Sequence, residues 1–358
     1  MTLEIKETSV NRTIGQMGKM GHEQLVFCSD LETGLKAIIA IHDTTLGPAL
    51  GGTRMWNYQD ESEALNDVLR LSRGMTYKAS ISGLQLGGGK AVIIGNADIH
   101  KTSALVKKFG EYVDNLGGRY ITAKDVGMDT NDMKDIRSVT KHVTGIPKDM
   151  GGSGDPSPLT AYGVFMGMKA SAKFKWGTDQ LSARKIIVQG VGHVGSELVR
   201  HLVSEGAEVY ITDINEQRSH EVSEKYDVKI KSDDFIYDND IDIYSPCALG
   251  ATLDTNTIEN LKCEIIAGAA NNQLNNEDIH SKQIRSKGII YAPDFLINAG
   301  GLINVYSEIK GYTEEEAIQK ADNIYETTLE ILLKSETDDI TTHESALSIA
   351  KQRIVKSK

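Results

Sequence analysis

The chain of 358 residues contains only three cysteines, which lie far apart at Cys28, Cys247 and Cys263. They form no CxxC pair and no zinc-ligand spacing, which excludes a disulfide scaffold and a structural zinc finger, so no metal site is expected. Widely spaced thiols of this kind are typical of a reducing compartment. We therefore expect a cytoplasmic protein.

Long hydrophobic runs and an excess of positive charge are also missing. No stretch approaches the ~18 apolar residues of a membrane span, and the segment MTLEIKETSVNRTIGQMGKM has no apolar signal core. The formal net charge of −11 argues against nucleic acid or an anionic membrane as a partner. Repeats and low-complexity tracts are absent too. The length and ordinary composition predict a globular protein of about two domains.

The most informative pattern of the chain lies in residues 185–213. An apolar run leads into the motif Gly190-x-Gly192-x-x-Gly195, an amphipathic helix pattern follows, and a second apolar strand ends on Asp213. The acid lies about 20 residues beyond the glycines, as in dinucleotide-binding βαβ units. A lone GxGxxG is often only a turn, but here strand, turn, helix, strand and acid are in register.

Each part of this pattern has a physical role. Gly190 permits the tight turn, Gly192 lets the backbone approach a pyrophosphate, and Gly195 allows close packing of helix and strand. The helix N-terminus supplies amide donors and a positive dipole. Asp213 can accept hydrogen bonds from ribose hydroxyls and would repel a 2′-phosphate, so the expected cofactor is NAD.

The dinucleotide unit begins halfway along the chain, so a different domain precedes it. Glycine and proline are concentrated in residues 151–158, and Ser157 followed by Pro158 is a good helix start. Helical stretches separate most strands of the second half, which predicts a doubly wound parallel sheet in an α/β fold. Expected strands are 24–28, 35–41, 90–94, 119–123, 241–245, 263–267 and 288–292; expected helices are 62–79, one capped by Ser103 and ended by Gly117-Gly118, 159–174, and the tail 313–358.

A second chemical signal lies in the first half of the chain. Three glycines precede Lys90 and a buried strand, and a desolvated lysine there would have a lowered pKa and could act as a base. Lys78 on the preceding helix can bind a carboxylate, and Asp125 after the next strand can exchange protons. Glycine-rich turns are common and most lysines are solvated, so residue chemistry alone leaves this assignment open.

With these motifs the chain resembles the glutamate/leucine/phenylalanine/valine family of amino-acid dehydrogenases, and most of all its leucine-specific members. The resemblance runs from about residue 20 to past residue 310. The matching stretches are IAIHDTTLGPALGGTRMW (39–56), LSRGMTYKAS (71–80), LGGGKAVIIG (86–95), GRYITAKDVG (118–127), PSPLTAYGV (156–164), the QGVGHVG loop, SPCALGAT (245–252), AGAANNQL (267–274) and YAPDFLINAGGLINV (291–305).

The resemblance implies the roles of the site residues. Lys90 is the general base that takes a proton from the water attacking the imine, and Asp125 relays protons. Lys78 and the Gly51-Gly52 backbone bind the substrate carboxylate, and Asn271 lies near the amine. Leu50, Ala123, Leu302 and Val305 line the side-chain pocket. Residues implied to contact the cofactor are Thr160, Gly190, Gly192, His193, Val194, Gly195, Asp213, Cys247, Ala248, Asn271 and Asn298.

The same resemblance implies the architecture. Residues 1–148 form a substrate and oligomerisation domain, residues 149–335 form an NAD-binding Rossmann domain, and a cleft lies between them. A C-terminal helix of about residues 336–358 packs back on the first domain, and the chain assembles as a homo-octamer. The implied reaction is reversible oxidative deamination, in which an L-amino acid, water and NAD give a 2-oxo acid, ammonium and NADH.

The side-chain pocket departs from a clean match to the leucine-specific members. They usually hold valine where this chain has Leu302, and Leu302, Gly89 and Tyr306 resemble enzymes of phenylalanine or tryptophan. Ala123 resembles the leucine enzymes, although Lys124 replaces their usual acid. One methylene in an apolar pocket changes discrimination by only ~1–3 kcal/mol. We expect a branched-chain aliphatic substrate, with an aromatic one as the alternative.

Two other classes of protein fit parts of the sequence. A hydroxy-acid dehydrogenase would normally offer a His–Asp or His–Glu pair, and no such pair is marked here; His193 itself is expected to be a solvated residue at a helix N-terminus. A non-catalytic NAD-binding protein should have lost Lys78, Lys90 or Asp125, yet all three are present. Cys247 is expected to be a small buried residue rather than a nucleophile.

Overall fold

The computed structural model describes residues 13–238 and 240–357, and contacts along the chain divide it into two compact units. Of the described residues, 13–80, 84–154 and 356–357 form the first unit, and 81–83, 155–238 and 240–355 form the second. The main division falls inside the glycine- and proline-rich segment 151–158, a few residues after the boundary expected at residue 148.

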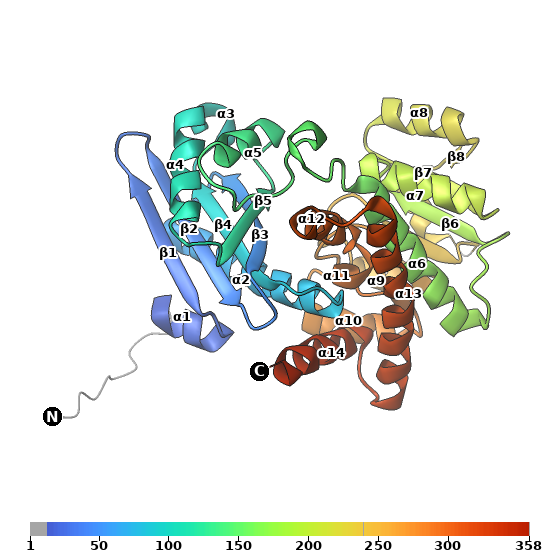
Figure 1. The fold of residues 1–358 in the computed structure, drawn as a ribbon. Helices are drawn as coiled ribbons and strands as arrows, with labels where there is room; N and C mark the ends of the chain where they lie inside the picture. The colour runs from blue at the N-terminus through green and yellow to red at the C-terminus, as the bar shows by residue number, and fades with distance from the viewer. Residues whose placement is uncertain (1–12, 239, 358) are drawn as a thin grey trace. The chain divides into compact units, whose positions relative to one another are not determined.

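The first unit is built on a five-stranded mixed sheet in the order β1-β2-β4-β3-β5 (Figure 1). β2 pairs antiparallel with β1 and β4, whereas β3 runs parallel to β4 and β5. The strands are β1 (Gln24–Asp30), β2 (Leu35–Asp43), β3 (Ala49–Trp56), β4 (Gly87–Ile94) and β5 (Tyr120–Lys124), and the helices are α1 (Thr13–Met20), α2 (Glu61–Ile81), α3 (Ala97–His100), α4 (Ser103–Asp114) and α5 (Thr130–Arg137).

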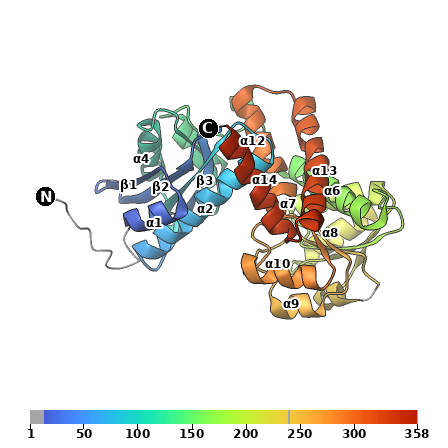
Figure 2. The ribbon, with the colours of Figure 1, turned by 90° about the horizontal axis from the view of Figure 1, so that it is seen from below.

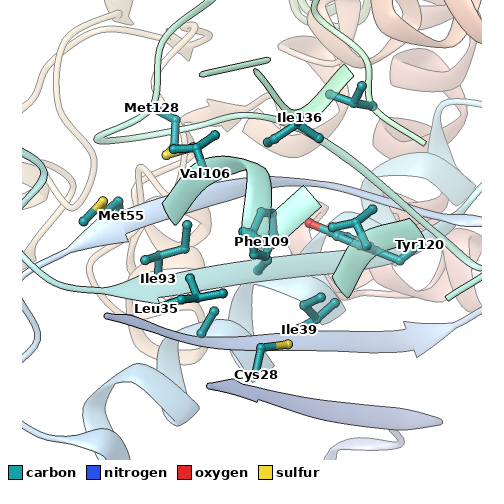
Figure 3. Close-up of a cluster of buried hydrophobic side chains, with 14 of the residues drawn as sticks. Cys28, Leu35, Ile39, Met55, Ile93, Val106, Phe109, Tyr120, Met128 and Ile136 are labelled. Carbon is teal, nitrogen blue, oxygen red and sulfur yellow. The ribbon is translucent and has the colours of Figure 1, made fainter. Parts of the chain in front are cut away.

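Helices cover both faces of this sheet, with α4 on one side and α1 and α2 on the other (Figure 2). Figure 3 shows the core on the α4 side, where Phe109 lies over Ile93 and close to Tyr120. On the other side, Val92 of β4 packs with Leu65 of α2. Side chains alternate along a strand, so these two cores fix which residues of β3, β4 and β5 face α2.

The second unit contains a six-stranded parallel sheet in the order β11-β10-β9-β6-β7-β8. Read from β8, this is the 3-2-1-4-5-6 order of a Rossmann fold, which confirms the expected fold class. The strands are β6 (Lys185–Gln189), β7 (Glu208–Thr212), β8 (Lys229–Ile230), β9 (Ile243–Pro246), β10 (Ile265–Ile266) and β11 (Ile290–Tyr291), and the helices are α6 (Ser157–Trp176), α7 (His193–Ser204), α8 (Glu216–Tyr226), α9 (Thr255–Asn260), α10 (Glu277–Ser286), α11 (Asp294–Ile297), α12 (Gly300–Lys310), α13 (Glu314–Thr337) and α14 (Thr342–Lys356).

Several local expectations need correction. The N-cap of α4 is Thr102, whose side chain accepts from the Leu105 N–H, so Ser103 is the first residue of the helix and not its cap. The helix ends at Asp114 with Asn115 as its C-cap, before Gly117-Gly118. β3 was not expected, because its glycine pair interrupts the strand pattern. All other expected strands and helices are present, with shifted ends.

The C-terminal helix α14 groups with the second unit as far as Val355. Ser345 of α14 donates a hydrogen bond to the backbone oxygen of Ile331 in α13 over 2.9 Å. Packing of a C-terminal helix on the first domain therefore stays a prediction. Within residues 13–238 and 240–357, no helix is both long enough and apolar enough to cross a bilayer.

Candidate active site

The α2-facing side of the first sheet carries most of the residues expected to bind substrate. In β3, Leu50 and Gly52 lie on this side, and their partners in β5 are Ile121 and Ala123. Lys90 lies two residues before Val92 in β4 and therefore shares its side of the sheet. The structure thus brings Lys90, Leu50, Gly52 and Ala123 to one face of the first sheet.

Lys90 forms an ion pair with Asp125, which directly follows β5. The side chains are only 9% and 22% exposed, so both charges are largely removed from water. Burial lowers the pKa of Lys90, against the attraction of Asp125. Burial alone would raise the pKa of Asp125, but Lys90 and then Arg54 outweigh it and hold that pKa below its usual range. A lysine with a lowered pKa beside an ionised carboxylate is suited to proton transfer.

Glycines surround this pair because side chains would not fit. A Cβ on Gly51 would lie 1.7 Å from the backbone oxygen of Gly89, and one on Gly52 would lie 2.9 Å from Cβ of Asp125. A Cβ on Gly88 would lie 2.1 Å from the backbone nitrogen of Thr76 in α2. Gly51-Gly52 of β3 and Gly87–Gly89 of β4 therefore let the two strands and α2 approach one another. Lys78 follows on the same helix, two residues after Thr76, and is half-buried.

Three residues that the sequence analysis did not single out complete the surroundings of the pair. Arg54 of β3 places Nε 3.4 Å from Oδ2 of Asp125 and Nη1 2.9 Å from Oδ2 of Asp67 in α2. The hydroxyl of Tyr58 donates to the same Asp67 oxygen over 2.8 Å. The signal available for Arg54 was its place in the GGTRMW stretch, in which a charged residue follows two glycines. Asp67 and Tyr58 gave no such signal.

In the second unit, the glycine loop has the geometry that its spacing predicts. Gly190 adopts φ +96°, and a Cβ there would lie 2.7 Å from Ala248. A Cβ on Gly195 would lie 2.0 Å from the backbone oxygen of Gly190. Gly192 is the N-cap of α7, and a Cβ there would meet no atom of the described residues within 4 Å. The space beside Gly192 at the start of α7 is therefore open among the described residues.

Asp213 directly follows β7, as the sequence analysis expected. Its Oδ2 accepts a hydrogen bond from the Val191 N–H over 2.9 Å, and its Oδ1 accepts one from the Asn215 N–H over 2.9 Å. Arg218 of α8 places Nη1 3.5 Å from Oδ2. The acid is thus held against the glycine loop. Arg218 was not expected at this place from the sequence.

The remaining residues expected to contact the cofactor form small groups in the second unit. Nδ2 of Asn298 donates to Oδ1 of Asn271 over 2.9 Å. A Cβ on Gly301 would lie 3.0 Å from Oγ1 of Thr160, so the first turns of α6 and α12 pack closely against each other. Leu302 and Val305 lie one helical turn apart on α12. All of these residues belong to the second unit, whereas Lys78, Lys90 and Asp125 belong to the first.

Two further residues of the loop region have distinct surroundings. The His193 side chain is 87% exposed, with Nδ1 3.8 Å from Oδ2 of Asp155. Cys247 is a free thiol whose Sγ lies 3.4 Å from Oγ of Ser245 and accepts from the Ala269 N–H, and burial raises its pKa. The residue is half-buried, and a thiol with a raised pKa is a poor nucleophile.

The open space beside Gly192, the closely packed Gly190 and Gly195, and the adjacent carboxylate of Asp213 suit the pyrophosphate and ribose of a dinucleotide. The first unit supplies a buried lysine–carboxylate pair. Both features are typical of dehydrogenases that use a pyridine nucleotide.

Comparison with known proteins gives the family. A sequence model described as Glu/Leu/Phe/Val dehydrogenase, dimerisation domain, matches residues 22–142, and one described as Glutamate/Leucine/Phenylalanine/Valine dehydrogenase matches residues 210–358. A leucine dehydrogenase of Bacillus subtilis (strain 168) is 53% identical over 338 residues, which cover 94% of this chain and 93% of that protein. A phenylalanine dehydrogenase of Bacillus thermotolerans is 45% identical over 98% of this chain and 93% of its own length.

A solved structure supports the same conclusion. The crystal structure of L-tryptophan dehydrogenase from Nostoc punctiforme matches with a TM-score of 0.87 and 45% identity over 97% of this chain and 99% of that one. The chain therefore belongs to the glutamate/leucine/phenylalanine/valine dehydrogenase family and is an amino-acid dehydrogenase. The resemblance stated from the sequence is confirmed.

Proposed function

We propose that the protein catalyses the NAD-dependent, reversible oxidative deamination of a branched-chain aliphatic L-amino acid, with leucine as the leading substrate. The observation that carries the proposal is the buried Lys90–Asp125 pair on the α2-facing side of the first sheet. A pyridine nucleotide supplies the acceptor for the hydrogen removed from the substrate Cα.

The residues of the first unit then have defined tasks. Neutral Lys90 takes a proton from the water that adds to the substrate imine, and returns it when ammonium leaves. Asp125, which is ionised at rest beside Lys90, exchanges protons with the substrate amine. Lys78 pairs with the substrate carboxylate, and the backbone of Gly51-Gly52 lies beside that group. Burial supports these roles, because a desolvated lysine reaches neutrality at a lower pH than a solvated one.

The residues of the second unit bind the cofactor in this proposal. The amides of Gly192, His193 and Val194 at the start of α7 hold the pyrophosphate, where the open space before Gly192 supports the assignment. Asp213 binds the ribose. Thr160, Cys247, Ala248, Asn271 and Asn298 surround the nicotinamide end, and Asn271 also contacts the substrate amine.

A branched-chain substrate is favoured by two independent points. Leucine dehydrogenases are among the relatives that reach 50% identity or more over most of the chain. In the pocket, Leu50 and Ala123 would face the substrate side chain, and the methyl group of Ala123 occupies space that glycine would leave to a ring. Leu302 and Val305 would complete the lining. Phenylalanine and tryptophan are the alternative substrates, because a tryptophan dehydrogenase and a phenylalanine dehydrogenase are also similar to this chain.

We also propose a homo-oligomer in the cytoplasm. The family description of residues 22–142 as a dimerisation domain supports the assembly, for which an octamer is the specific expectation. The three free cysteines support a reducing compartment.

A panel of amino acids tests the substrate directly. NADH formation should be fastest with leucine, isoleucine and valine, measured as kcat/KM at fixed NAD. A preference of tenfold or more for phenylalanine or tryptophan would assign the chain to the aromatic-specific members.

Removal of the base tests the mechanism. Lys90→Ala should lower kcat by ~10²–10⁴-fold, as expected for loss of a general base, and leave the calorimetric affinity for NAD unchanged. Retention of more than about a tenth of the wild-type kcat would show that Lys90 is not an essential base.

A further inference from the structure

One guanidinium group in the first unit contacts two carboxylates that have different roles. Nε of Arg54 lies 3.4 Å from Oδ2 of Asp125, the same oxygen that pairs with Lys90. Nη1 of Arg54 lies 2.9 Å from Oδ2 of Asp67. The Arg54 side chain is only 23% exposed, so these contacts are made largely out of water. The order of charges is therefore lysine, carboxylate, arginine, carboxylate.

Asp67, the carboxylate at the end of this series of charges, is held by further contacts. Besides Arg54, Asp67 accepts from the hydroxyl of Tyr58 over 2.8 Å, and Nη2 of Arg70 lies 3.2 Å from its other oxygen. Asp67 lies on α2, whereas Arg54 lies on β3, two residues after Gly52. A planar guanidinium held in this way has a fixed orientation, which a lysine in the same place would not have. Asp125 thus meets a positive charge of fixed position.

This arrangement has two electrostatic consequences for the reacting pair. Arginine stays charged at every relevant pH, so it favours the ionised form of Asp125. The same charge disfavours the protonated form of Lys90, since both lie on one carboxylate oxygen. The pKa shifts agree with both consequences, because the charge of Arg54 lowers the pKa of Lys90 and that of Asp125.

We propose that Arg54 is a positioning residue of the reaction: its guanidinium holds the Asp125 carboxylate against Lys90, and its fixed charge favours the neutral, proton-accepting form of that lysine. The inference rests on the proposed function, in which Lys90 is the base. In this proposal Arg54 acts through its contact with Asp125. Asp67 balances its charge and fixes its direction.

Other titratable groups lie on the elements packed around Lys90 and must be considered in a pH experiment. They are Asp125 after β5, Arg54 of β3, Tyr58 after β3, Asp67 and Lys78 of α2, and His42 of β2. Burial lowers the pKa of His42 and raises that of Tyr58, so both are neutral across the working range of the lysine. The charges that respond to substitution near Lys90 are therefore those of Arg54, Asp67 and Asp125, together with Lys78.

The pH profile of deamination tests the role of Arg54. kcat/KM for one amino acid should rise with pH as Lys90 loses its proton. Deprotonation of the substrate amine also affects this profile, but equally in every variant. Arg54→Gln should move this rise to higher pH by ~1 unit, because a positive neighbour is lost. Asp67→Asn should move it to lower pH, because Arg54 is then unbalanced. Arg54→Lys should keep the wild-type position with a reduced kcat, since an ammonium cannot bridge both carboxylates.

Arg70→Gln is the matched control, since it removes the same charge from the same Asp67 without contacting Asp125. The Arg70 side chain is 52% exposed, so its removal should leave the profile in place. A folded Arg54→Gln variant with the wild-type profile would overturn the inference. If the Arg54→Gln variant does not fold, the inference is overturned by an Asp67→Asn variant whose pH profile stays in place or moves to higher pH. An active Lys90→Ala variant would instead refute the proposed function.

Discussion

The carboxylate of Asp213 accepts a hydrogen bond over 2.9 Å from the backbone N–H of Val191, which lies between the first two glycines of the loop. The end of β7 is thereby tied to the turn that follows β6. The same carboxylate oxygen lies 3.5 Å from Nη1 of Arg218, so a negative and a positive side chain share the place where a dinucleotide ribose is expected.

The first prediction concerns the choice of cofactor. The wild-type protein should use NAD more efficiently than NADP by ~10-fold or more, because a like-charge contact with a 2′-phosphate costs at least ~1.4 kcal/mol. In Asp213→Ser, Arg218 loses its carboxylate partner and can pair with the phosphate, so the preference should narrow or reverse. The measurement is kcat/KM for both cofactors on both proteins. Equal use of NADP by the wild type would show that Asp213 does not lie at the ribose.

The second prediction compares two glycines of the same loop. Gly195→Ala should lower the melting temperature by several degrees and abolish NAD binding, since its Cβ would lie 2.0 Å from the backbone oxygen of Gly190. Gly192→Ala should leave the melting temperature unchanged and weaken only NAD binding, because its Cβ enters the open space before α7. Calorimetry with NAD and thermal unfolding separate the two effects. Wild-type NAD affinity in Gly192→Ala would place the pyrophosphate elsewhere.

The third prediction concerns the side-chain pocket. Leu302 is buried in α12, and Leu302→Val should shift preference further toward aliphatic substrates by a factor of a few to tens, consistent with ~1–2 kcal/mol for small changes in apolar pockets. The ratio of kcat/KM for leucine and phenylalanine measures it. Ile303→Val, a buried neighbour on the same helix, is the control and should leave the ratio unchanged. An unchanged ratio in Leu302→Val would show that Leu302 does not line the pocket.

The fourth prediction concerns stability at acid pH. His22 lies beside His42 with ring centroids 4.8 Å apart, and its Nε2 lies 2.8 Å from Oγ of Ser72 and 3.1 Å from the backbone oxygen of Leu69. Burial, and then His42, lower the pKa of His22 from 6.5 to about 4. Nδ1 of His22 has no hydrogen-bond partner among the described residues, so protonation there would bury an unpaired donor.

A lowered folded-state pKa means that the unfolded chain binds the proton first. Neutral His22 therefore contributes its full share to the free energy of unfolding above pH 6.5. This contribution, about 3 kcal/mol, is lost as the pH falls from 6.5 to about 4. Urea unfolding at pH 7 and pH 5 should therefore show a smaller pH effect in His22→Gln than in the wild type. His220→Gln, at an exposed position on α8, should behave like the wild type.

Local sequence patterns predicted much of the fold because they report on neighbours in the chain. The glycine loop, α7, β7 and the acid at residue 213 all follow from spacing within one βαβ unit. β3 was missed because Gly51 and Gly52 are poor strand formers. They are required by contacts with Gly89 and Asp125, which come from other parts of the chain. The cap of α4 was misplaced by one residue, since Thr102 and Ser103 are both good caps.

The sequence by itself determined the family, the glycine loop and the presence of Lys78, Lys90 and Asp125, because these rest on residue identity and short spacing. Only the tertiary structure decided which groups act on the lysine. Arg54, Asp67 and Asp125 come from β3, α2 and the end of β5, and no spacing along the chain predicts that they meet. Electrostatic attraction depends on distance in space and on exclusion of water, and both arise only when the sheet and α2 pack together.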